Sequence, residues 1–322
     1  MNWIKLEHLL LKAQPERAVT ANPVLNHAHL CAQALSLAAG LKEQGVQRVA
    51  VHFEDAADLA IALLGAWRAG VSVLLPADLQ PQTRQRWSSD VDLWLTDLAG
   101  DGHLTDYQHP PMPPAELDLD LCRLSVCTSG SSGEPKRIEK TLRQLANEVQ
   151  ALEALWGVDL GEACIISSVA TQHIYGLLFR VLWPLCAGRP FVRTQLAFPE
   201  DLQRASREQH TFAWVASPAL LKRMGDNLDW PALTPVKRVF SSGGALPLEA
   251  AGSLHQRRSG HHSKDDRDDH DTLILLNVAC NRSPVRLEYP AQVGQKSAPE
   301  CGAKHGEEQE LWQRHTGHAC RD

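Results

Sequence analysis

The chain has 322 residues, of which 43% are hydrophobic and 22% charged, which is ordinary for a globular protein and excludes wholesale disorder. Its 32 Lys and Arg residues against 38 Asp and Glu residues give a net charge of −6, so it lacks the basic surface that nucleic-acid binding requires. No apolar run approaches the roughly 20 residues that span a bilayer. The eight cysteines form no CxxC pair. Together these features predict a cytoplasmic protein with reduced thiols and neither a nucleic-acid nor a membrane partner.

Predicted helices and strands alternate along the chain up to Gly252. Helices are expected at 30–41, 58–69 and 141–156, each ended by a glycine: Gly45, Gly70 and Gly157. Buried strands are expected at 46–53, 71–75, 91–96, 123–127, 163–168, 212–216 and 236–241. This alternation predicts an α/β fold of layered subdomains with mostly parallel sheets.

Two breaks in composition divide the chain. The proline-rich segment His109–Pro114 predicts a stiff connection between an α/β subdomain at 1–108 and a second one at 115–251. Beyond Gly252 the apolar content falls, and residues 257–271 contain no apolar side chain. Because such a stretch buries nothing that offsets the entropy of ordering, we expect an irregular or disordered tail at 252–322.

The segment most informative about chemistry follows the strand at 123–127. It contains four hydroxyl side chains and two glycines, then Pro135 and Lys136. Glycines let backbone N–H groups converge on an anion, hydroxyls donate to phosphate oxygens, and a lysine adds positive charge, so the segment suits phosphate binding. It is not a Walker A loop, because only two residues separate Gly130 from Gly133. Composition alone leaves an ordinary polar surface loop equally open.

The spacing of this loop resembles a family signature. Residues 128–136, T-S-G-S-S-G-E-P-K, are similar to the phosphate-binding motif T-S-G-[ST]-[ST]-G-x-P-K-G of the adenylate-forming (AMP-binding) superfamily, which includes acyl-CoA synthetases, aryl-acid ligases and peptide-synthetase adenylation domains. Arg137 replaces the final glycine. Segments 69–85, 172–178, 211–221 and 239–247 resemble further family motifs in the same order, so the resemblance covers the N-terminal large-domain portion of such enzymes.

The resemblance implies roles for particular residues. The polyphosphate of ATP would be held by Thr128, Ser129, Gly130, Ser131, Ser132, Gly133 and Lys136, with Lys136 also acting in catalysis. Gly243, Gly244 and Ala245 would border the adenine, while His173 and Gly176 would lie at the acyl pocket. The residues themselves leave plainer readings open: a core position for His173, an ordinary turn at 243–245, and core packing for Leu177, Leu178, Phe179 and Leu182.

The family reaction implies an ATP-dependent acid–thiol ligase that uses ATP and Mg²⁺. A carboxylate attacks the α-phosphorus of ATP, and a thiol then takes the acyl group from the adenylate. The partners would be a carboxylic acid and the thiol of coenzyme A or of an acyl carrier protein. The acid stays open between aryl and fatty acyl types, and the sequence assigns no metal ligand.

Downstream the family pattern breaks. The Y-G-x-T-E segment, whose glutamate helps to hold Mg²⁺, and the T-G-D segment, whose aspartate holds the ribose, are missing from residues 251–322, as is a C-terminal domain with a catalytic lysine. The hypotheses for this tail are a shift of the coding frame near 255–258, a natural extension, and a metal-binding patch of His255, His261, His262 and His270. We therefore expect a truncated ligase of impaired activity. The alternative is a non-catalytic remnant that binds nucleotide, an acyl group or a protein.

Overall fold

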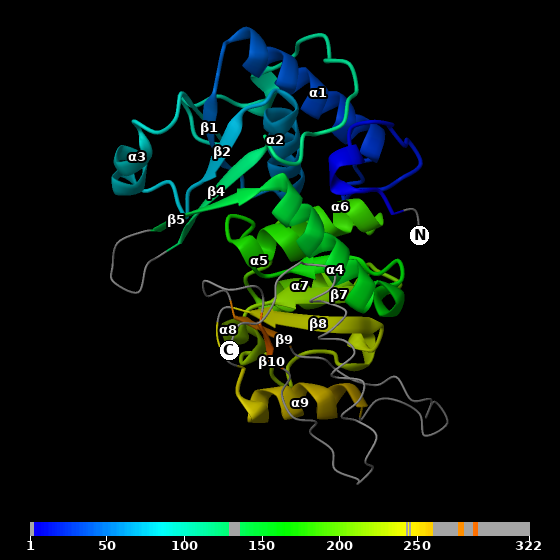
Figure 1. The fold of residues 1–322 in the computed structure, drawn as a ribbon. Coiled ribbons are helices and arrows are strands. Elements are labelled where there is room, and N and C mark those ends of the chain that lie inside the picture. Colours follow the sequence, from blue (N-terminus) through cyan, green and yellow to red (C-terminus); the bar gives the residue numbers. More distant parts are fainter. Residues whose placement is uncertain are drawn as a thin grey trace. The chain divides into compact units, whose positions relative to one another are not determined.

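A computed structural model describes residues 3–128, 136–242, 244, 246–259, 276–279 and 286–288. The chain forms two compact units (Figure 1). Unit 1 comprises Met1–Gln150 and Ala170–Thr194, and unit 2 comprises Ala151–Val169 and Gln195–Asp322. The proline-rich segment 109–114 lies inside unit 1. The division into 1–108, 115–251 and 252–322 stays a proposal about the subdomains.

Unit 1 is built on a five-stranded sheet with the order β3-β1-β2-β4-β5. Its elements before α4 are η1 (Leu6–His8), α1 (His27–Glu43), β1 (Arg48–His52), α2 (Ala56–Arg68), β2 (Ser72–Leu75), α3 (Pro81–Trp87), β3 (Leu93–Thr96), η2 (Leu104–Asp106), β4 (Arg123–Thr128) and β5 (Lys136–Thr141). The first four strands in the sheet are parallel, and β5 runs antiparallel to β4. The parallel strands and the helices between them confirm the predicted α/β class.

The helices of unit 1 begin and end where side-chain and backbone chemistry require it. Asn26 caps α1 by accepting from the N–H of His29, and Asp55 caps α2 in the same way. Gly45 and Gly70 follow these helices with φ of +70° and +77°, as the sequence predicts. Helix α2 buries nearly all of its residues and packs against α1, β1 and β2, so it forms the centre of the unit 1 core.

Helix α4 (Leu142–Leu160) contains residues of both units. It begins with the predicted capping box, in which the Thr141 N–H donates to the Gln144 side chain and the Gln144 N–H donates to the Thr141 hydroxyl. The predicted end at Gly157 is wrong, because the helix continues to Leu160 and Gly161 follows with φ of +52°. Burial of Leu160 to 1% exposure offsets the cost of about 1 kcal/mol for a glycine inside a helix.

The second part of unit 1, Ala170–Thr194, contains one nearly continuous helical segment. It consists of α5 (Ile174–Gly176), the π-helical η3 (Leu177–Leu182) and α6 (Trp183–Ala187), which ends at Gly188 in the left-handed conformation. Leu177, Leu178, Phe179 and Leu182 are all buried, as the core interpretation predicts. This segment therefore contributes mainly apolar packing.

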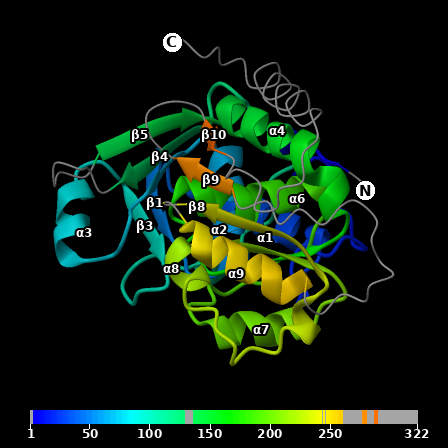
Figure 2. The same cartoon turned by 90° about the horizontal axis from the view of Figure 1, so that it is seen from below.

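Unit 2 has its own five-stranded sheet, with the order β6-β7-β8-β9-β10. Its elements are β6 (Cys164–Ser167), α7 (Pro199–Arg207), β7 (Phe212–Ala216), α8 (Pro218–Leu221), η4 (Pro231–Leu233), β8 (Val236–Ser242), α9 (Leu248–Ser259), β9 (Leu276–Ala279) and β10 (Arg286–Glu288). Strands β6 to β9 are parallel, and β10 is antiparallel to β9. Figure 2 shows β9 beside β8.

Within the tail, the structure describes the end of α9 and the short strands β9 and β10. Helix α9 continues to Ser259, and β9 adds a parallel strand to β8. For the rest of 252–322, the irregular or disordered tail stays a prediction. Leucine and valine in β9 explain its strand, because β8 offers an unpaired edge next to an apolar run. The candidate metal-binding residues His261, His262 and His270 lie outside the described residues, as does the side chain of His255.

Two expectations from composition can be compared with the described part of the chain. Cys31, Cys122, Cys127, Cys164 and Cys186 are free and buried, as expected for reduced structural thiols. Burial raises the pKa of Cys31 to about 12 and that of Cys122 to about 11, so these thiols are unreactive at neutral pH. Among the described residues, no helix is both long enough and apolar enough to cross a membrane.

Candidate functional site

The candidate phosphate loop connects two antiparallel neighbours, β4 and β5. Thr128 ends β4 and lies opposite Lys136, which begins β5 (Figure 1). Strand β4 is buried because it lies between β2 and β5, whereas β5 is mostly exposed at the sheet edge. Residues Ser129, Gly130, Ser131, Ser132 and Gly133 lie outside the described residues. The structure thus fixes both ends of the loop and places Lys136 at an exposed position at one of them.

Arg137, the departure from the family motif, is held on the surface of β5. Its guanidinium lies 3.4 Å from an Asp90 oxygen and 2.6 Å from a Glu139 oxygen. Both carboxylates neutralise its charge, although such exposed pairs stabilise a fold by at most about 1 kcal/mol. The arginine therefore fits this edge strand without needing a ligand.

The segment that contains His173 and Gly176 is held tightly within unit 1. The Gln172 side chain donates to the Phe53 carbonyl oxygen at 2.7 Å, and both residues are buried. Gly176 has no space for a side chain, since an added Cβ would lie 2.0 Å from the Ala170 oxygen. His173 itself is exposed at the start of α5, so the alternative of a buried core histidine is wrong. The imidazole of His173 is therefore exposed on a segment whose backbone is tightly packed.

Two buried hydroxyls on either side of His173 were missed by the sequence analysis. Thr171 Oγ1 and the Tyr175 hydroxyl have no hydrogen-bond partner among the described residues. Burial raises the pKa of Tyr175 well above its usual value, so the phenol stays protonated and able to donate. Orphaned buried hydroxyls are costly in a native protein. No sequence pattern reveals them, because their isolation depends on packing.

The turn after β8, in unit 2, differs from the segment at 170–176 in how its glycine is packed. Gly244 is exposed, and an added Cβ would meet no atom of the described residues within 4 Å. Gly243 and Ala245, the other two predicted adenine neighbours, lie outside the described residues. Ser241, three residues before Gly244, has a buried hydroxyl with no partner in the described part of the chain.

The structure brings some predicted residues into one unit and separates others. Thr128, Lys136, His173 and Gly176 all belong to unit 1, whereas Gly244 belongs to unit 2. Residues 129–135 of the loop lie outside the described residues, so no ligand for Mg²⁺ is assigned there. Within the described residues, the one group of three His, Cys, Asp or Glu ligand atoms lying close together is formed by Glu7, His8 and Glu116, away from β4 and β5 in the chain. We therefore derive no step through Mg²⁺.

Comparison with known proteins agrees with this fold and these motifs. The AMP-binding enzyme family matches residues 75–263, which is more than half of the chain and includes the β4–β5 loop. The chain belongs to the family of AMP-binding enzymes. The predicted membership of the adenylate-forming superfamily is confirmed for this N-terminal portion.

The curated relatives are much longer than this chain. The probable non-canonical nonribosomal peptide synthetase CymA of Salinispora arenicola is 27% identical over 201 residues, which is 61% of this chain and 2% of that protein. N-(5-amino-5-carboxypentanoyl)-L-cysteinyl-D-valine synthase of Penicillium chrysogenum is 27% identical over 204 residues, 53% of this chain and 5% of that protein. The chain thus spans only a few per cent of these relatives.

Solved structures share the fold at low sequence identity. MatB from Rhodopseudomonas palustris has a TM-score of 0.71 and 16% identity, covering 91% of this chain and 63% of MatB. A malonyl-CoA ligase bound to methylmalonyl-CoA and AMP has a TM-score of 0.66 and 22% identity, covering 84% of this chain and 60% of the ligase. These likenesses confirm an α/β fold like that of the N-terminal part of adenylate-forming enzymes.

Proposed function

We propose that this chain binds the polyphosphate of ATP at the loop between β4 and β5, as part of an ATP-dependent acid–thiol ligase. The observation that carries the proposal is the family signature at 128–136, located in a hairpin whose ends are Thr128 and Lys136. Glycines in such a loop allow the backbone N–H groups to converge on an anion, and the hydroxyls can donate to its oxygens.

The chemistry of this loop is charge neutralisation. Adenylation joins a carboxylate oxygen to the α-phosphorus and releases pyrophosphate, so negative charge must be stabilised on the departing phosphates. A lysine about 4 Å from a phosphate charge contributes roughly 4 kcal/mol at an effective dielectric of 20. We assign this role to Lys136, with hydroxyls and backbone groups of Thr128, Ser129, Ser131 and Ser132 completing the cradle and Gly130 and Gly133 allowing the bend.

The acid is proposed to bind near His173. Three observations support this: the imidazole is exposed, Gly176 packs closely against the Ala170 backbone, and the hydroxyls of Thr171 and Tyr175 lack partners among the described residues. Unsatisfied hydroxyls suit an oxygen-bearing ligand better than a purely apolar one. Gly243, Gly244 and Ala245 are proposed to border the adenine, because Gly244 has open space where a Cβ would stand.

The acyl acceptor and the efficiency of the reaction are also proposals. The acceptor is the thiol of coenzyme A or of a carrier protein, in a cytoplasmic setting that matches the free buried cysteines. We propose impaired turnover, because Y-G-x-T-E and T-G-D are missing from residues 251–322 and with them the expected ligands for Mg²⁺ and ribose. The same absence favours the second candidate, a non-catalytic remnant that still binds nucleotide.

Pyrophosphate exchange separates the two candidates. Labelled pyrophosphate and ATP are incubated with the full chain and a panel of acids. Malonate and methylmalonate are included because a malonyl-CoA ligase shares the fold, and amino acids, aryl acids and fatty acids complete the panel. Acid-dependent exchange that disappears in Lys136→Ala supports the ligase. ATP binding without exchange for any acid supports the remnant, and absence of ATP binding contradicts both.

A further inference from the structure

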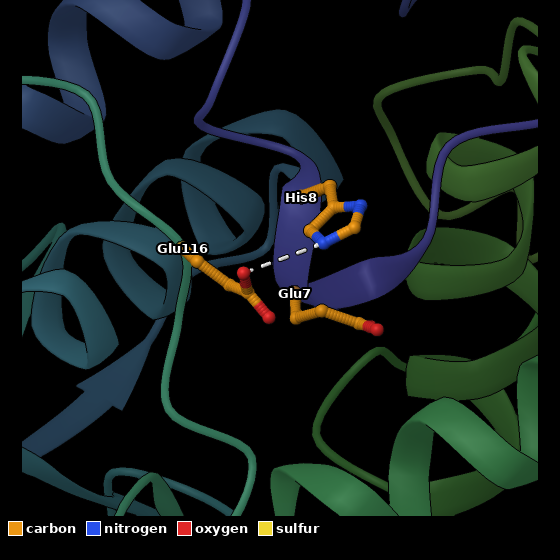
Figure 3. Close-up of side chains that lie close together, drawn as sticks. All are labelled: Glu7, His8 and Glu116. Carbon is orange, nitrogen blue, oxygen red and sulfur yellow. Dashed lines mark ion pairs between the residues drawn. The ribbon is translucent and has the colours of Figure 1, made fainter.

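A three-residue cluster lies away from the proposed ATP site in the sequence, within unit 1. Glu7 and His8 are on the short helix η1, and Glu116 is on the extended segment that follows the proline-rich stretch. One ligand atom of each lies within 4.8 Å of the others. Figure 3 shows the His8 ring facing the Glu116 carboxylate, with Glu7 extending from the same turn as His8.

Both backbone segments are fixed by burial and by a hydrogen bond. Leu6 and Leu9 on either side of the cluster are 1% exposed, and Leu117 next to Glu116 is 2% exposed. The Leu117 N–H donates to the Glu7 carbonyl oxygen at 2.9 Å. The three side chains therefore start from anchored positions, which reduces the entropy lost when a common ligand orders them.

The charges of the cluster are incompletely balanced by the protein. His8 Nε2 lies 3.6 Å from a Glu116 oxygen, which is longer than a hydrogen bond. Glu7 exposes only 8% of its surface, and its hydrogen bond with Leu117 is made by its backbone oxygen rather than by its carboxylate. Arg143 interacts electrostatically with Glu7, but its guanidinium forms an ion pair with an Asp120 carboxylate oxygen at 2.6 Å. A divalent cation bound between the two carboxylates would balance their charges.

The donor set matches a particular class of cation. One imidazole nitrogen and two carboxylate oxygens are ligands that Zn²⁺ accepts, and two carboxylates neutralise its charge. Tetrahedral zinc with bonds of about 2.0–2.2 Å separates its ligand atoms by about 3.3–3.5 Å. The His8–Glu116 distance of 3.6 Å is already close to this value, whereas the Glu7 carboxylate, which extends away from Glu116 in Figure 3, would have to turn toward the other two ligands. We propose that Glu7, His8 and Glu116 form a zinc site that ties η1 to the segment at 116–117.

The test is zinc binding by the full chain with a matched control. Equilibrium dialysis against buffered Zn²⁺, followed by metal analysis, gives the number of tightly bound ions for the wild type, His8→Ala and Glu116→Gln. His109→Ala is the control, because His109 forms a similar pair with Glu43 at 3.1 Å in the same unit without a third ligand. The control also allows for zinc that binds to other histidines, since each histidine variant removes one.

We expect the wild type and His109→Ala to bind one more zinc ion per chain than His8→Ala, or to bind it at least about tenfold more tightly. Zinc should raise the Tm of the wild type and of His109→Ala, and raise it less for His8→Ala. Glu116→Gln keeps the test decisive if His8→Ala fails to fold, because Glu116 is exposed and its loss should not disturb folding. Equal stoichiometry, affinity and Tm shift in Glu116→Gln and His109→Ala would overturn the proposal.

Discussion

Two glycine-bearing regions of the molecule, the segment at 170–176 and the turn after β8, differ in what makes a glycine necessary. At Gly176 the protein itself forbids a side chain, because the Ala170 oxygen lies 2.0 Å from where a Cβ would be. At Gly244 the protein imposes no such limit within 4 Å. Packing explains the first glycine, whereas packing against the described residues does not explain the second.

A second contrast lies within the segment at 170–176. Gln172 and Gly176 are buried and satisfied by the protein, whereas Thr171 and Tyr175 in the same segment carry buried hydroxyls that lack partners. Packing therefore accounts for some residues of this segment and not for their neighbours. Substitutions can separate the effect of packing from that of ligand binding.

The largest expected effect is on stability at Gly176. Gly176→Ala should lower the free energy of unfolding by about 3 kcal/mol, because the methyl group forces the backbone at Ala170 to move. Gly244→Ala, with open space around it, should change it by less than about 0.5 kcal/mol. Urea unfolding of both variants measures the difference. Similar free energies of unfolding for the two variants would contradict the claim that packing requires a glycine at 176 and not at 244.

A smaller effect concerns the other end of the 170–194 segment, where Arg193 pairs with Asp55 at 2.6 Å and Asp58 at 3.1 Å. Burial and the neighbouring Asp55 raise the pKa of Asp58 to about 6, against the opposing charge of Arg193. The folded state therefore binds the proton more tightly than the unfolded state, and stability from this group is lost as the pH rises from about 4 through 6. Because Asp58 is partly exposed, we expect a loss of about 1–2 kcal/mol.

The Asp58→Asn variant isolates this effect. Its free energy of unfolding, measured at pH 4.5, 6 and 7.5 beside that of the wild type, should lack the decline that Asp58 causes. Buried His27, whose pKa burial and the charge of Arg17 lower to about 4, acts in the opposite direction in both proteins and cancels in the difference. A wild-type minus variant difference that is constant across this range would contradict the assigned pKa direction.

The smallest expected effect is at Tyr175. Tyr175→Phe should leave stability unchanged or raise it by up to about 1 kcal/mol, because the hydroxyl it removes has no partner in the described structure. If the hydroxyl contacts the acid, the same variant should weaken binding of that acid while ATP affinity stays constant. Thermal unfolding and ligand titration together check this. A clear loss of stability would show that the hydroxyl already has a structural partner.

The sequence predicts the parallel strands up to β8, α1, α2 and the capping box of α4 because these depend on local periodicity and end signals. It does not predict β5, since K-R-I-E-K-T is polar and becomes a strand only by pairing with β4. Likewise Gly157 resembles a helix end, yet burial of Leu160 continues the helix. The phosphate loop is recognisable from spacing alone, whereas the isolation of Thr171 and Tyr175 and the approach of Glu116 to His8 arise from tertiary contacts.

The central claim, that the loop ending at Lys136 binds the polyphosphate of ATP, is tested most directly by ATP affinity. Calorimetric titration compares the wild type with Lys136→Ala and with Lys140→Ala, which removes the same charge four residues along β5. We predict at least about a tenfold loss of affinity for Lys136→Ala, as expected for a charge-assisted bond, and less than about a twofold loss for Lys140→Ala. Equal affinities for the two variants, or no ATP binding by the wild type, would contradict the claim.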